Sequence, residues 1–73
     1  MIGRWQQALL NFEERRDQVR SEIEAIEQIN LATGLGYVAE QQAMLANLRE
    51  ILRCYEENVR KAGIMAEAEA ERS

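Results

Sequence analysis

Histidine is absent from this sequence and cysteine is nearly so, and both shortages remove classes of chemistry. The 73 residues contain no histidine and a single cysteine, Cys54. A structural zinc site needs about four His or Cys ligands, and a catalytic nucleophile usually needs a base such as histidine beside it. One cysteine also excludes a disulfide within the chain. The sequence therefore predicts a protein that is not an enzyme, with no metal, cofactor or small-molecule substrate.

Proline and long apolar runs are also missing. No apolar run approaches the roughly 20 residues that a membrane-spanning helix needs. The opening residues 1–16 have too short an apolar core, and acidic residues too early, for a secretory signal. A lone thiol fits a reducing compartment. We therefore expect a cytoplasmic protein that does not contact membranes.

Basic residues are fewer than acidic ones, and this disfavours binding to nucleic acids. The chain has 9 basic and 13 acidic residues, for a formal net charge of −4. Without a broad basic surface there is little to neutralise a phosphate backbone, so nucleic-acid binding is disfavoured. The local cluster of Arg15, Arg16 and Arg20 keeps a DNA-binding regulator as the lowest of the alternatives.

What the sequence does contain is a strong helical repeat. Apolar residues recur at alternating spacings of three and four, the a and d positions of a heptad, over about four heptads in each half of the chain. In the first half, Arg16 and Asn30 occupy a positions between the apolar ones. The other a and d residues are Ile2, Trp5, Leu9, Phe12, Val19, Ile23 and Ile26 in the first half and Val38, Gln41, Leu45, Leu48, Leu52, Tyr55, Val59, Ala62 and Ala66 in the second.

Two glycines separate the repeats. The segment 31–36, LATGLG, predicts a turn in which Gly34 adopts the left-handed conformation that ends a helix, and Thr33 or Gly36 begins the next one. The fold prediction is all-α: an antiparallel, coiled-coil-like hairpin over residues 1–73, as a single domain. Its predicted parts are a helix over about 3–31, a turn over 32–36, a second helix over about 37–66 and a frayed acidic tail over 67–73.

A short turn makes the two helices antiparallel neighbours and suggests a register. Folding the chain at 32–36 sets a positions against a positions and d against d, with Trp5 opposite Ala62. In that register Arg16 lies opposite Leu52, with Glu56 across the seam. We interpret Arg16 as a polar residue that sets register and oligomeric state, with a binding role as the alternative, and Asn30 as a second such residue.

The flanking positions predict a surface that one hairpin cannot bury. The g positions of the second helix are mostly apolar, whereas its e positions are mostly polar. An exposed apolar stripe on a small protein usually marks an interaction face, and two hairpins docked by such stripes form a four-helix bundle. The predicted dimer or partner interface comprises Leu10, Arg16, Tyr37, Met44, Arg49, Ile51, Arg53 and Met65.

The function expected from these features is protein binding without catalysis. A small dimeric hairpin would sequester, inhibit or chaperone a partner protein, with a helix of that partner as one route of binding, as phage or bacterial inhibitors and adaptors do. In size and acidity the chain is similar to co-chaperones that hold type III secretion needle subunits, although no motif carries that similarity. A secretion-type co-chaperone or a structural assembly subunit is therefore the alternative.

Overall fold

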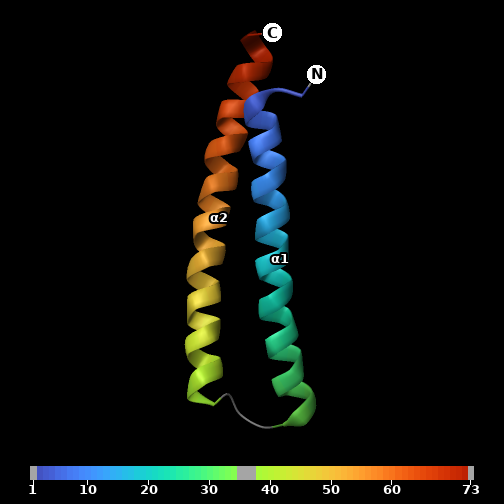
Figure 1. Cartoon of the computed structure of the whole chain (residues 1–73), viewed down its shortest axis with the longest axis vertical. Helices are drawn as coiled ribbons and strands as arrows, with labels where there is room; N and C mark the ends of the chain where they lie inside the picture. The colour runs from blue at the N-terminus through green and yellow to red at the C-terminus, as the bar shows by residue number, and fades with distance from the viewer. Residues whose placement is uncertain (1, 35–37, 73) are drawn as a thin grey trace.

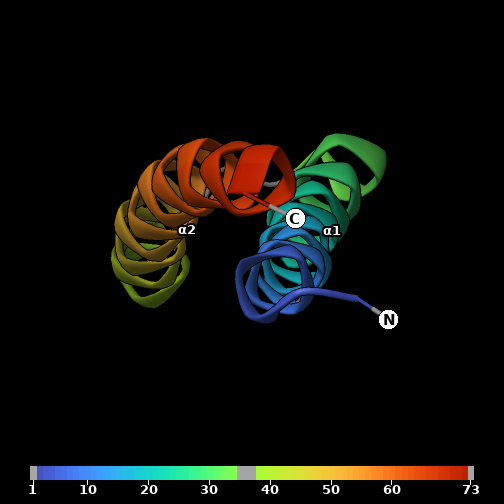
Figure 2. The ribbon, with the colours of Figure 1, turned by 90° about the horizontal axis from the view of Figure 1, so that it is seen from above.

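The chain folds into two long helices. The computed structural model describes residues 2–34 and 38–72, and it has the helices α1, Arg4–Thr33, and α2, Ala39–Arg72. They lie side by side and antiparallel over a length of 54 Å, with both chain termini at one end (Figure 1). Seen from above, the helices cross, and α2 arcs toward α1 at that end (Figure 2). The predicted helical hairpin is confirmed.

Gly34 ends α1 as the sequence predicted. It adopts a left-handed conformation with φ 70°, and its N–H donates to the carbonyl of Asn30 at 3.1 Å. Thr33, a candidate to begin the second helix, is instead the last residue of α1, where its hydroxyl donates to the carbonyl of Ile29 at 3.0 Å. The other candidate, Gly36, lies outside the described residues.

Helix α2 begins with a side-chain cap. The backbone carbonyl of Val38 accepts the first helical hydrogen bond, from Gln42. The backbone N–H of Val38 donates to Oε1 of Gln41 at 3.4 Å. A Gln three residues into a helix that reaches back to the preceding N–H is one half of a capping box. Glu40 in the first turn adds the negative charge that the helix dipole favours there.

The predicted end of α2 near residue 66 is wrong, because the helix continues through Arg72. The tail has no single apolar stripe in its sequence, but alanine is the strongest helix former and glutamate is also favourable. Ala62 and Ala66 are 1% and 7% exposed, so this part of α2 packs closely on α1. Tertiary contact therefore supports a segment that its own pattern left undecided.

One of these contacts caps α1 from across the hairpin. Gly3 precedes α1 without a side-chain cap, and the first turn of α1 has no acidic residue. The carboxylate of Glu69 on α2 fills this role: Oε1 accepts from the backbone N–H of Arg4 at 2.7 Å, and Oε2 from that of Trp5 at 2.8 Å. A β-carbon on Gly3 would collide with the Glu69 carboxylate, so glycine permits the approach.

The core between the helices is small. Among the described residues, only Ile23, Leu45, Ala62 and Ala66 are buried. We call the part near the loop, with Ile23 and Leu45, the turn end, and the part near the chain termini, with the two alanines, the terminal end. A core of this size leaves most apolar side chains only partly covered.

The contacts across the seam lie one to two helical turns from those of the predicted register. Glu56, expected beside Arg16, instead pairs with Arg20, four residues further along α1, at 3.6 Å. Trp5, expected opposite Ala62, donates its backbone N–H to Glu69, seven residues further along α2. A displacement by whole turns keeps apolar positions in the seam. Asn30 does not act across the seam; its amide donates to the carbonyl of Ile26 on its own helix at 3.0 Å.

Candidate interaction surface

The two edges that flank the helix–helix seam differ in chemistry. On one side, the e positions of both helices face one another and form ion pairs. Arg20 pairs with Glu56 at 3.6 Å, and Arg49 pairs with Glu27 at 3.2 Å. We call this side the ionic edge. Each exposed pair contributes up to about 1 kcal/mol, so the edge is covered by charge without being held rigidly.

On the opposite side, the g positions of both helices lie beside the d positions of α1. The exposed side chains there are largely apolar, apart from Arg15 and Glu22 at the middle of α1. Ile29, Met44 and Met65 are 59%, 54% and 42% exposed, while Ile51 is half-buried between them along α2. This apolar edge runs the length of the hairpin. Its members are Trp5, Phe12, Val19, Ile26, Ile29, Met44, Ile51, Asn58 and Met65.

Near the terminal end, the apolar edge is hollowed into an open groove of about 470 Å³. Trp5 and Phe12 of α1 lie on one side of it, and Ala62 and Met65 of α2 lie on the other. The groove arises because Ala62 is too small to fill the space beside two aromatic rings. An apolar side chain from another molecule would complete the packing that the hairpin leaves unfinished.

The structure brings only part of the predicted interface together. Met44, Ile51 and Met65 share the apolar edge, as their common heptad position implies. Tyr37 lies outside the described residues. Leu10 is 44% exposed but sits at a b position, away from this edge. The apolar stripe therefore forms one surface, to which the predicted arginines do not belong.

The two predicted arginines of α2 are engaged elsewhere. Arg49 belongs to the ionic edge through Glu27, and Arg53 pairs with Glu50 of its own helix at 3.5 Å. Both side chains are largely exposed. Their positions point away from the apolar edge, so they would not orient a ligand bound there.

Arg16 lies at the seam with its charge turned to the surface. Its side chain is 24% exposed, and its guanidinium contacts Oδ1 of the adjacent Asp17, with Nε at 3.1 Å. The aliphatic stem is covered while the charged end reaches solvent, which is how a long arginine occupies a partly apolar position. The contact that the sequence suggested, with Glu56, is made by Arg20 instead.

The arginine cluster offers little surplus charge for phosphate binding. Arg16 and Arg20 each have an acidic partner, Asp17 and Glu56, in the structure. Arg15 lies at a g position beside the apolar edge. The three cations thus point in different directions, which does not favour a basic surface of the kind that duplex DNA requires.

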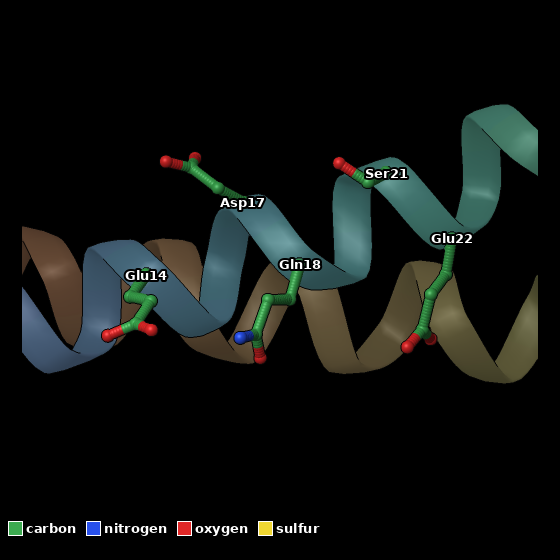
Figure 3. Close-up of a pocket in the computed structure, with 5 residues that line it drawn as sticks. All are labelled: Glu14, Asp17, Gln18, Ser21 and Glu22. Carbon is green, nitrogen blue, oxygen red and sulfur yellow. The ribbon is translucent and has the colours of Figure 1, made fainter.

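A shallow acidic hollow lies on the solvent side of α1 and extends from the outer face, with Glu14, to the border of the apolar edge, with Glu22. Glu14, Gln18 and Glu22 are spaced four apart and extend to one side, while Asp17 and Ser21 extend to the other (Figure 3). These side chains diverge into solvent. In residues 2–34 and 38–72, no group of three or more His, Cys, Asp or Glu side chains is placed to hold a metal ion.

One ion pair within α2 shifts the pKa values of its two side chains. Glu57 accepts from Arg60 one turn later at 3.1 Å, and this hydrogen bond lowers the pKa of the Glu57 carboxyl and raises that of the Arg60 guanidinium. Both side chains are largely exposed, so the pair acts locally on the helix. Cys54, also exposed, has a free thiol.

Sequence reasoning did not find Glu69, although two signals pointed to it. It occupies a d position, where a charged residue is out of place, and α1 begins after a glycine that has no side chain with which to cap it. Together they indicate a carboxylate near an unsatisfied helix end. The contact between Glu69 and the start of α1 was not predicted, because the second helix was expected to end before Glu69.

Comparisons with protein families, with characterised proteins and with solved structures found no match to this chain. Neither described helix contains a stretch long and apolar enough to cross a membrane.

Proposed function

We propose that this chain is a non-enzymatic protein–protein interaction module that works through its apolar edge. The observation that carries the proposal is the contrast between the two edges. Charge covers one side of the seam, while Met44 and Met65 remain exposed along the other, with Ile51 half-buried between them. A continuous apolar strip between two helices is the shape that receives an amphipathic helix.

In the absence of another partner, a second copy of the chain occupies this edge, giving a four-helix bundle. The accessible surface is 5751 Å², whereas a compact monomer of 8.4 kDa exposes about 4,600 Å² by the usual scaling with mass. The excess, about 1,100 Å², is comparable to the about 800 Å² that each subunit buries in a standard interface. The small core gives a further reason, because domains of this size usually need a partner.

A partner protein would then exchange with the second copy by offering an apolar helical face to the same edge. Binding of this kind covers the partner's helix and sequesters it, which inhibits or protects the partner according to what that helix does. The groove beside Trp5 and Phe12 gives a large side chain of the partner a place to insert.

The test compares two adjacent positions on α2. Met44 lies on the apolar edge. Ala43, the preceding residue, is exposed on the outer face of α2. Met44→Glu should leave helicity intact by circular dichroism but convert the dimer to a monomer in sedimentation equilibrium. Ala43→Glu adds the same charge and should stay dimeric.

The same pair of variants tests partner binding. A stoichiometric partner should co-purify with the wild type and with Ala43→Glu, and it should be lost with Met44→Glu and Met65→Glu. Co-purification that is equal for all four proteins, or absent from all of them, would overturn the proposal. Open-ended oligomers of the wild type would support a structural assembly subunit in its place.

A further inference from the structure

The charges that border the apolar edge are segregated by sign along its length. At the c and g positions of both helices, the terminal half carries basic residues alone and the turn half carries acidic residues alone. All six are exposed, and none forms an ion pair within the described part of the chain. The basic set is Arg4, Arg15, Lys61 and Arg72, and the acidic set is Glu22 and Glu40.

The exposed apolar side chains of this edge are divided in a similar way. Trp5 and Met65 lie at the terminal end, beside the open groove, and Ile29 and Met44 lie at the turn end. One end is therefore hollowed and basic, and the other presents apolar side chains flanked by acidic ones. A surface divided like this complements a copy of itself that is turned end over end.

We propose that the apolar edge binds a second copy of this chain in the antiparallel sense, about a two-fold axis perpendicular to the long axis of the hairpin. This inference rests on the dimer in the proposed function and adds its orientation. Each α1 then lies against the partner's α1, and each α2 against the partner's α2. The terminal end of one protomer meets the turn end of the other.

The charges nearest the axis fit this arrangement. The midpoint of α1, Arg4–Thr33, falls between Gln18 and Val19, and this point is also midway between Arg15 and Glu22. A two-fold axis through it brings Arg15 of each protomer to Glu22 of the other, so the pair forms twice. Both residues are at g positions, on the side of α1 that borders the apolar edge.

The parallel alternative would lose this match. A two-fold axis along the hairpin sets α1 against the partner's α2 with like ends together. Arg4 and Arg15 would then lie near Lys61 and Arg72 of an identical copy. Like charges placed across an interface oppose association, and nothing acidic at the c and g positions of that half offsets them.

A charge exchange between protomers tests the orientation. Arg15→Glu and Glu22→Arg each place like charges at both contacts of the homodimer, which should weaken its association about tenfold. When the two variants are mixed, the antiparallel heterodimer has opposite charges at both contacts. Native mass spectrometry should show heterodimer well above its statistical share.

The matched control is Glu14→Arg, which makes the same charge change on the outer face of α1. It should leave the homodimer affinity within about twofold of the wild type. If Glu14→Arg weakens the dimer as strongly as Glu22→Arg, net charge explains the effect and the proposal fails. A heterodimer at its statistical share would also overturn it.

Distances between labels give a readout that does not depend on charge. A nitroxide on Ala43→Cys, in a Cys54→Ala background, lies on the outer face about 12 residues from the middle of α2. In an antiparallel dimer the two labels are displaced along the axis by about 38 Å, since a helix rises 1.5 Å per residue. A parallel dimer brings them to the same height. A short distance in an intact dimer would refute the orientation while leaving the proposed function standing, whereas a monomer at every concentration would refute both.

Discussion

The two ends of the hairpin are held together by different means. At the turn end, Ile23 and Leu45 fill the space between the helices, and the Glu27–Arg49 pair closes one edge. At the terminal end, the alanines Ala62 and Ala66 let the helices approach, and the Glu69 carboxylate joins them by capping α1. Side-chain volume therefore dominates at one end, and close approach with directed hydrogen bonds dominates at the other.

This difference shows how a two-helix protein joins helices that its core alone would not hold. Apolar contact is non-directional and tolerates sliding of one helix along the other, whereas a carboxylate that binds two backbone N–H groups does not. The turn end supplies burial, and the terminal end supplies register. Substitutions at each end separate the two contributions.

The largest expected effect is at the turn end. Leu45 is 2% exposed, and Leu45→Ala should lower the free energy of unfolding by about 2–4 kcal/mol through lost burial and a cavity. Urea denaturation measures the change. Leu31 is 85% exposed, so Leu31→Ala should change stability by less than about 0.5 kcal/mol. Equal effects for the two leucines would mean that the turn end has no packed core.

A smaller effect is expected from removing the cap at the terminal end. Glu69→Ala leaves the N–H groups of Arg4 and Trp5 without their carboxylate and should cost about 1 kcal/mol. Amide exchange in the first turn of α1 should rise at the same time. Glu71→Ala, two residues further along α2, serves as the control.

Gly3→Ala gives an independent test of the same cap. The added methyl group displaces the Glu69 carboxylate, so this variant should lose the same hydrogen bonds. The double variant with Glu69→Ala should then be less destabilised than the sum of the two single changes. Additive effects would show that Gly3 and Glu69 act separately.

A gain in stability of about 1 kcal/mol is expected from Gly63→Ala. Glycine in a helix interior is less favourable than alanine, and a β-carbon at this position meets nothing within 4 Å. The thermal midpoint should rise, and the gain should persist in a Glu69→Ala background because the effect is local. A loss of stability would indicate that a neighbour occupies this space in solution.

The smallest effect belongs to the pair within α2. Because Arg60 lowers the pKa of Glu57 in the folded state, the pair stabilises the helix above the unfolded pKa of about 4.3, and this stability is lost as the pH falls through the folded value. In Glu57→Gln, the decrease of the thermal midpoint on acidification should be slightly shallower than in the wild type. An unchanged pH profile would show that the exposed pair contributes nothing measurable.

Sequence reasoning succeeded where the physics is local. The heptads gave the helices, and Gly34 gave the end of α1, because helix formation and a left-handed cap depend on residues a few positions apart. Met44, Ile51 and Met65 lie along one face of α2 for the same reason, and their role in an interface stays a prediction. Arg49 and Arg53 were grouped with them by charge type alone, and the structure places both elsewhere.

The register was not predictable in this way. Moving α2 by whole turns keeps apolar positions in the seam and leaves the apolar match nearly unchanged. The register of the two helices depends on long-range contacts, such as those of Arg20 with Glu56 and of Glu69 with the start of α1. Glu69 lies more than 60 residues from its hydrogen-bond partners, so no local pattern connects them.

The sequence by itself therefore determined that this protein is a helical hairpin with one charged and one apolar edge, since periodicity and composition specify helix faces. The tertiary structure alone decided how far α2 extends and which residues meet across the seam. Apolar stripes slide past one another at little cost, whereas a capped helix end and paired charges have one position that satisfies them.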